Sequence, residues 1–142
     1  MDIINYVKIS DGIQTSGQPK EHEFEQIHET GTQTVVNLAL PDHKEAIPNE
    51  GACVTALGMN YIHIPVVWKS PQPEQYQLFE SIMKAHTSMS IWIHCALNWR
   101  VASFIYLYRT RCLGVSPTDA ERTLTSVWEP NEVWSDFIRA NA

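Results

Sequence analysis

One stretch of the sequence, residues 90–114, predicts a buried strand that is followed directly by a helix. Its apolar run Ile91–Ile93 has no polar interruption, which is typical of a strand buried on both faces. In Val101–Leu113 apolar residues recur at helical spacing, and Gly114 provides a stop signal. A buried strand joined to a helix by a short loop is typical of α/β folds, and it therefore constrains how the rest of the chain can fold.

The loop of this stretch lies between His94-Cys95 and Arg100, and it combines the features of an anion site. The start of a helix leaves several backbone N–H groups without partners, with the positive end of the helix dipole behind them. A cysteine in such a field favours the thiolate, with pKa values of roughly 3.5–7.5 against about 8.5 for free cysteine. An arginine adds a fork of donors that suits an oxyanion. The alternative is structural, since cysteine is often a small buried apolar residue.

Strand-like and helix-like segments alternate along the whole chain. The expected strands are Tyr6–Ile9, Ile13–Ser16, Gln33–Ala39, Asn60–Val67 and Ile91–Ile93, and the expected helices are Pro19–His28, Pro48–Leu57, Glu74–His86, Val101–Leu113, a helix capped by Ser116-Pro117 that ends at Val127, and Pro130–Arg139. This pattern predicts an α/β fold, with one domain over residues 1–142 and a central, mostly parallel sheet of four to five strands covered by helices on both faces. In the helix over residues 74–86, we expect Leu78, Ile82 and Met83 to face the core.

The composition excludes several classes of function. A formal net charge of -6 argues against nucleic acid and anionic membrane surfaces as partners. No apolar run is long enough to cross a bilayer, and the first residues contain no apolar signal core. The three cysteines are odd in number and widely spaced, which suits a reducing cytoplasm better than a disulfide framework. The histidines show no metal-ligand spacing, so we expect no metal and no cofactor. The sequence sets no oligomeric state.

The stretch HCALNWR, residues 94–100, resembles the signature loop of the cysteine-dependent protein tyrosine and dual-specificity phosphatases. Three further stretches resemble a small bacterial group within that superfamily, which includes the beta-lactamase-hydrolase-like phosphatase domain. They are GIQTSGQP at 12–19, TVVNLALP at 34–41 and MNYIHIPV at 59–66. The resemblance spans most of the chain, and it implies a phosphatase-like fold with the signature loop between a strand and a helix.

The resemblance also implies a reaction and a substrate class. Cys95 is expected to attack the phosphorus of a small phosphate monoester or a phosphoprotein, and a phosphocysteine intermediate forms. The expected phosphate-binding residues are Ala96, Leu97, Asn98, Trp99 and Arg100. His94, directly before the nucleophile, is expected to orient the loop carbonyls. This chemistry requires no metal ion.

The loop departs from the phosphatase pattern in three respects. Only four residues lie between Cys95 and Arg100, so the loop is one residue short, which is about 3.3–3.6 Å of chain. Asn98 stands where the pattern has glycine, a mild change because asparagine tolerates the left-handed conformation. Val101 replaces the hydroxyl residue that helps the thiolate leave, and the nearest substitute is Ser103. Hydrolysis of the phosphocysteine, the second step of the reaction, is therefore expected to be slow.

A general acid is missing from its usual place. In parallel sheets ligands bind beyond the carboxyl ends of the strands, so we expect the loops over 40–47, 67–73 and 96–100 to meet. In the phosphatases the acid is usually an Asp on the second of these loops, and here that loop has none. Asp42 is our prediction for the proton donor, with His43 and Glu74 as further candidates. Weak acid catalysis favours aryl phosphates, including phosphotyrosine-like substrates, over alkyl phosphates.

Two other functions remain open. A cysteine followed by four residues and an arginine has the loop length of rhodanese-type sulfurtransferases, in which a smaller ring of N–H groups holds a persulfide. Alternatively, the chain is a non-catalytic module that binds an oxyanion without turnover. Trp68 and Trp99 either form a wall for an aromatic substrate or pack at the rim of the sheet.

Overall fold

The computed structural model describes all residues, 1–142, and contains one five-stranded sheet with the strand order β1-β2-β5-β3-β4. The strands are β1 (Val7–Ser10), β2 (Ile13–Ser16), β3 (Thr34–Asn37), β4 (Asn60–His63) and β5 (Ile91–His94). β1 pairs antiparallel with β2, and every other pairing is parallel. The predicted fold class, a mostly parallel α/β sheet of four to five strands, is confirmed.

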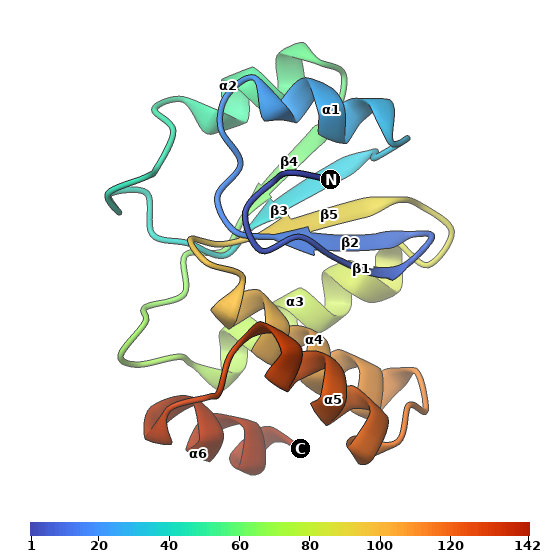
Figure 1. The fold of residues 1–142 in the computed structure, drawn as a ribbon, viewed down its shortest axis with the longest axis vertical. Coiled ribbons are helices and arrows are strands. Elements are labelled where there is room, and N and C mark those ends of the chain that lie inside the picture. Colours follow the sequence, from blue (N-terminus) through green and yellow to red (C-terminus); the bar gives the residue numbers. More distant parts are fainter.

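Helices cover both faces of the sheet, which makes three layers (Figure 1). The helices are α1 (Glu23–Glu29), α2 (Glu50–Ala56), α3 (Pro73–Ala85), α4 (Trp99–Cys112), α5 (Pro117–Val127) and α6 (Glu132–Asn141). The first two lie on one face, and the other four lie on the opposite face. None of these helices is both long enough and apolar enough to span a lipid bilayer.

β5 occupies the middle of the sheet because its residues suit burial on both faces. All four residues of Ile91–His94 are buried, as are those of its neighbour β3. Ile93 contributes to the core cluster of 21 residues beneath α3–α6, whereas Trp92 contributes to the cluster of 7 residues beneath α1 and α2. The strand is therefore fixed from above, below and both sides, and it holds its carboxyl end, where Cys95 follows, in a defined place.

An aromatic cluster joins α4 to the helices beside it. Phe104 on α4 lies 5.5 Å from Tyr76 and 5.4 Å from Phe79, both on α3, measured between ring centroids. On α6, Phe137 stacks on Phe104 at 6.0 Å. The core face of α3 is formed by Tyr76, Phe79 and Met83, so the prediction for Leu78 was wrong: its side chain is 52% exposed. Tyr76 and Phe79, three residues apart, set which face of α3 is buried. This face is shifted by one residue from the position predicted for Leu78.

Several helices and strands are shorter than predicted at the carboxyl edge of the sheet. α1 begins at Glu23 and not at Pro19, and α2 begins at Glu50 because Asn49 takes a left-handed conformation with φ of 59°. β3 ends at Asn37, whose side-chain oxygen accepts the N–H of Ala39 and turns the chain. These segments form loops rather than regular elements, and the loops lie together beside the end of β5 (Figure 1).

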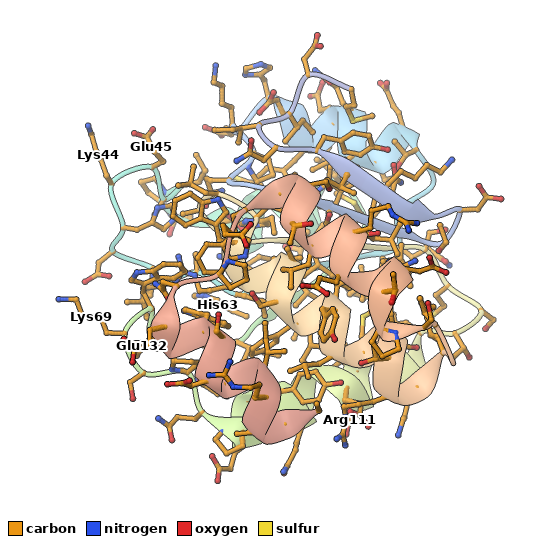
Figure 2. All side chains as sticks on the ribbon, turned by 60° about the horizontal axis from the view of Figure 1, so that its bottom comes forward. Lys44, Glu45, His63, Lys69, Arg111 and Glu132 are labelled. Carbon is orange, nitrogen blue, oxygen red and sulfur yellow. The ribbon has the colours of Figure 1, made fainter.

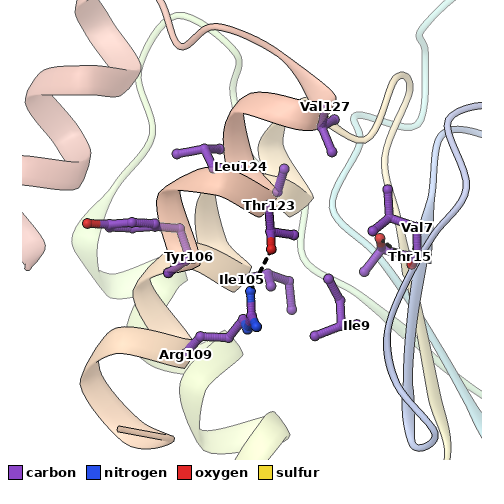
Figure 3. A pocket seen from close by; sticks show the side chains of 11 residues that line it. Val7, Ile9, Thr15, Ile105, Tyr106, Arg109, Thr123, Leu124 and Val127 are labelled. Atoms are coloured by element: carbon purple, nitrogen blue, oxygen red, sulfur yellow. Dashed lines mark hydrogen bonds between the residues drawn. The ribbon is translucent and has the colours of Figure 1, made fainter. Parts of the chain in front are cut away.

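The seam between the edge strand and the helices is closed by apolar side chains. Figure 3 shows Val7 and Ile9 of β1 facing Ile105 of α4 and Val127 of α5 across a small cavity. At one end of this seam the guanidinium of Arg109 donates to the hydroxyl of Thr123, at 2.9 Å, and joins α4 to α5. The helix that starts at the signature loop is thereby held on both sides.

Replacement of Phe104 by alanine is expected to lower the free energy of unfolding by about 3–5 kcal/mol, because the change leaves a cavity among aromatic rings. Leu78→Ala on α3 is the control, since Leu78 is half-exposed and should change stability by less than about 0.5 kcal/mol. Urea unfolding followed by tryptophan fluorescence measures both. Equal losses in the two variants would contradict the described core.

Candidate active site

Cys95 and Arg100 line the same pocket, which has a volume of about 150 Å³. Cys95 follows directly after β5, and Arg100 lies in the first turn of α4. Both side chains are buried, with 1% and 8% of their surface exposed. The pocket is completed by Trp68, Ala96, Leu97 and Trp99. The structure therefore brings together the sulfur, the guanidinium and the loop that the sequence singled out.

The loop presents its backbone N–H groups with no protein acceptor. None of the N–H groups of residues 96–101 donates a hydrogen bond within the protein, and the first helical bond runs from Ala102 to Asn98. The loop carbonyls, in contrast, are held from outside: that of Cys95 by His94 Nδ1 at 3.2 Å and that of Ala96 by the N–H of Gln18 at 2.9 Å. In a trans peptide the N–H points away from the preceding carbonyl, so fixing these oxygens outward directs the following N–H groups inward. The result is a ring of free donors beside Cys95.

Asn98 closes the shortened loop. It has φ of 70° and ψ of 5°, the left-handed conformation expected for an asparagine in place of glycine, and α4 begins at the next residue. Its side chain is fully buried, and Nδ2 donates to the carbonyl of Asn5 at 2.8 Å and to the hydroxyl of Thr15 at 3.1 Å. The loop, with only four residues between Cys95 and Arg100, is therefore fixed by the side chain of Asn98.

The N-terminal segment packs against the outer side of the loop. Asn5 donates from Nδ2 to the carbonyl of Leu97 at 2.9 Å, while its own carbonyl accepts from Asn98, so the two asparagines hold each other. Gly17 lies where a Cβ atom would come within 2.6 Å of the carbonyl oxygen of Ala96. Asn5 was not predicted from the sequence, and Gly17 was recognised only as part of the stretch over residues 12–19 that resembles a phosphatase turn.

Arg100 is held by the loop after β4. Its Nη1 donates to the carbonyl of Val66 at 2.9 Å, and its Cζ lies 5.7 Å from the ring centroid of Trp68. This contact fixes one edge of the guanidinium, and no other protein acceptor contacts it. The remaining N–H groups are therefore available to an anion in the pocket.

Four tryptophans form a cluster at the rim of the pocket. Trp68 lies 5.7 Å from Trp99, 5.3 Å from Trp128 and 5.7 Å from Trp134, between ring centroids. Trp99 and Trp128 stack face to face at 5.1 Å, and the indole N–H of Trp134 donates to the carbonyl of Trp68 at 2.9 Å. Two alternatives for Trp68 and Trp99 followed from the sequence, a wall of the pocket or packing against other side chains. Both hold, since the two rings pack in this cluster and also line the pocket.

A chain of buried polar side chains lies behind the loop. His94 Nε2 is 2.7 Å from Oε2 of Glu50, whose Oε1 accepts from Nε2 of Gln18 at 2.7 Å. Burial raises the pKa of Glu50, but hydrogen bonds from His94, Gln18 and Tyr61 outweigh it and hold that pKa below its usual value. Gln18 Oε1 lies 3.0 Å from Nε2 of His43. Burial, followed by the charges of Arg100 and His94, lowers the pKa of His43.

Two predicted residues lie away from the pocket. Asp42 is exposed on the loop after β3 and does not line the pocket with Cys95. The hydroxyl of Ser103 is buried and donates to the carbonyl of Trp99 at 2.9 Å. The roles of Asp42 as proton donor and of Ser103 in the second step stay predictions. Figure 2 shows that Lys44 and Lys69, on the loops that flank the site, point into solvent.

Comparison with solved structures places the fold. A candidate phosphatase (DUF442) from Shewanella putrefaciens CN-32 superposes with a TM-score of 0.87 at 28% sequence identity, over 98% of this chain and 91% of that chain. The chain has the fold of the cysteine-dependent phosphatases. The resemblance inferred from residues 94–100 is thereby confirmed.

Two more distant structures have the same fold. The core catalytic domain of the PP-IP phosphatase SIW14 from S. cerevisiae gives a TM-score of 0.83 at 17% identity, over 100% of this chain and 88% of that chain. TpbA from P. aeruginosa gives a TM-score of 0.79 at 16% identity, over 98% of this chain and 86% of that chain. No protein-family model and no curated protein sequence matches the chain.

Gly17→Ala is expected to lower the free energy of unfolding by about 1–3 kcal/mol, because the added Cβ overlaps the carbonyl of Ala96 and displaces the loop. Gly12→Ala is the matched control, since its Cβ meets only Met89 O at 3.5 Å. The control should change stability by less than about 1 kcal/mol. Denaturant unfolding compares the two proteins, and a Gly17→Ala variant as stable as the control would refute the close contact.

Proposed function

We propose that the protein is a cysteine-dependent phosphatase that hydrolyses phosphate monoesters through a phosphocysteine intermediate. The observation that carries the proposal is the ring of free N–H groups over residues 96–101, which surrounds a pocket lined by Cys95 and Arg100. Donors fixed in advance around a buried site stabilise the charge of a transferring phosphoryl group without reorganisation. The similarity to the Shewanella candidate phosphatase supports the same reaction.

The proposed reaction has two steps. The Cys95 thiolate attacks phosphorus in line, an S–P bond forms, and the P–O bond to the leaving group breaks. The loop N–H groups and Arg100 bind the nonbridging oxygens throughout. Water then attacks phosphorus, the S–P bond breaks, and inorganic phosphate and the thiolate are released. No proton donor is assigned near the pocket, and Asp42 stays the sequence-based prediction for that role.

Aromatic phosphate monoesters fit the surroundings of the pocket best. Its walls are apolar and include Leu97, Trp68 and Trp99, and no lysine lines it. A wider groove of about 680 Å³ adjoins the loop at Ala96 and Leu97 and gives room for the rest of a phosphoprotein substrate. Among structures with this fold, TpbA has been solved with phosphotyrosine and PTPMT1 with PI(5)P. The apolar lining and the acidic net charge favour the first of these classes for this chain.

A thiolate nucleophile requires a compartment in which thiols stay reduced. All three cysteines, Cys53, Cys95 and Cys112, are free in the structure. We therefore propose that the protein acts in the cytoplasm.

The central experiment compares the wild type with Cys95→Ser and with Cys112→Ser, a control on the same side of the sheet. Wild type and control should hydrolyse para-nitrophenyl phosphate, and Cys95→Ser should lose at least about 1,000-fold in kcat, because serine is a far weaker nucleophile at neutral pH. Calorimetry should still detect phosphate binding to Cys95→Ser.

Other outcomes would overturn the proposal. If the wild type binds phosphate or vanadate but hydrolyses no ester, the chain is an oxyanion-binding module. If it transfers sulfur from thiosulfate to cyanide and hydrolyses no ester, the protein is a rhodanese-like sulfurtransferase and not a phosphatase. Equal hydrolysis by wild type and Cys95→Ser would exclude a cysteine nucleophile.

Aryl phosphates should be turned over faster than alkyl phosphates. A general acid typically contributes about 100- to 10,000-fold, and the benefit is largest for poor leaving groups such as alkoxides. With no acid lining the pocket, kcat/KM for phenyl phosphate should exceed that for a simple alkyl phosphate at least about 100-fold. Steady-state release of phosphate measures both, and comparable values for the two esters would reveal a proton donor in the site.

A further inference from the structure

We propose that Glu50 and Gln18 hold His94 as a doubly protonated imidazolium directly behind Cys95, which makes Glu50 a positioning residue for the nucleophile. The inference rests on the proposed function for its purpose, but its geometry and its test do not require turnover. It concerns two residues on elements far from the signature loop in sequence. Glu50 was not identified from the sequence, and Gln18 was identified only as part of the stretch over residues 12–19.

The two ring nitrogens of His94 each face an oxygen atom. The ring is fully buried, so only protein atoms can satisfy it. Nδ1 lies 3.2 Å from the carbonyl oxygen of Cys95, and Nε2 lies 2.7 Å from the carboxylate of Glu50. A carbonyl oxygen accepts only, and an ionised carboxylate also accepts only. Both ring nitrogens must therefore carry a proton, which gives the ring a positive charge.

The hydrogen bonds of Glu50 fix its charge. Its side chain is 5% exposed, and each of its oxygens accepts a hydrogen bond, one from His94 and the other from the amide of Gln18. Burial opposes ionisation, but these donors together with Tyr61 keep the pKa of Glu50 below its usual value. A carboxylate that accepts from both sides is ionised at neutral pH. The pair is therefore a buried ion pair.

The hydrogen bonds of Gln18 have one consistent direction. His43 Nδ1 accepts from the N–H of Glu45 at 3.3 Å, so this ring is neutral and carries its proton on Nε2, which donates to Oε1 of Gln18. Gln18 must then direct its NH₂ group toward Glu50. Burial lowers the pKa of His43, which agrees with a neutral ring. The outer histidine is neutral, and the inner one is charged.

The consequence for Cys95 is both electrostatic and geometric. Glu50 from α2 contacts the His94 ring, His43 on the loop after β3 lies near enough for its pKa to be lowered by the charge of His94, and Arg100 from α4 lines the pocket with Cys95. Glu50 meets the far nitrogen of the ring, so the positive ring lies between that carboxylate and the loop. Cationic side chains beside a cysteine generally favour its thiolate form. The Nδ1–H also holds the carbonyl of Cys95 outward, which directs the N–H of Ala96 into the ring of donors.

The test uses the full chain and two readouts that do not depend on turnover. In the wild type, ¹⁵N NMR of the His94 ring at pH 7 should show two protonated nitrogens, and in Glu50→Gln it should show a neutral ring. The alkylation rate of Cys95 by iodoacetamide at pH 6, measured by mass spectrometry of its peptide, should fall about tenfold in Glu50→Gln. The control is Glu29→Gln, which lies at the exposed end of α1 and should change neither readout.

The outcomes separate this inference from the proposed function. A neutral His94 ring in the wild type at pH 7, or an unchanged alkylation rate in folded Glu50→Gln, overturns the inference. If Glu50→Gln does not fold, the wild-type NMR spectrum alone decides. A protein that hydrolyses no phosphate ester but shows the imidazolium and the alkylation effect would refute the phosphatase proposal and leave the role of Glu50 intact.

Discussion

The structure depends on a loop whose backbone N–H groups have no partners of their own. Backbone donors without acceptors are costly wherever water cannot reach them, and proteins keep them only where the surrounding structure enforces their position. Here the enforcement comes from the opposite side of each peptide, since the carbonyls of Cys95, Ala96 and Leu97 are bound by His94, Gln18 and Asn5. The donors are therefore fixed before any anion arrives, which is the condition for strong electrostatic stabilisation of a phosphoryl group.

The support for this loop comes from both faces of the sheet. On one face, Asn5 and Gln18 donate to the loop carbonyls, and Glu50 holds the ring of His94. On the other face, Arg100 and the tryptophan cluster around Trp68 connect it to α4 and α6. In the phosphatases that the chain resembles, the loop that follows the strand in the position of β4 usually supplies an acid. In this chain it supplies an aromatic wall and an anchor for the arginine instead, and this agrees with the preference for aryl esters that we propose.

Local features of the site were predictable from the sequence, whereas its long-range contacts were not. The strand, the loop and the helix over residues 90–114 follow from local periodicity, and the left-handed Asn98 follows from residue type. Glu50, in contrast, lies 44 residues before His94, and Asn5 lies 93 residues before Asn98. Nothing in their own neighbourhoods marks them, because only the strand order of the sheet brings them to the loop. The prediction that Leu78 faces the core was wrong for a related reason, since tertiary packing of aromatic rings decided which face of α3 is buried.

The most direct test of this account is an NMR titration of the ¹⁵N-labelled protein with inorganic phosphate. If residues 96–101 form the anion site, their amide resonances should shift together along one binding curve, while those of α5 should stay unchanged. The same titration with Arg100→Ala should show weaker binding at the same amides. If phosphate shifts amides elsewhere and leaves residues 96–101 unmoved, the loop does not bind the anion, and the phosphatase account is contradicted.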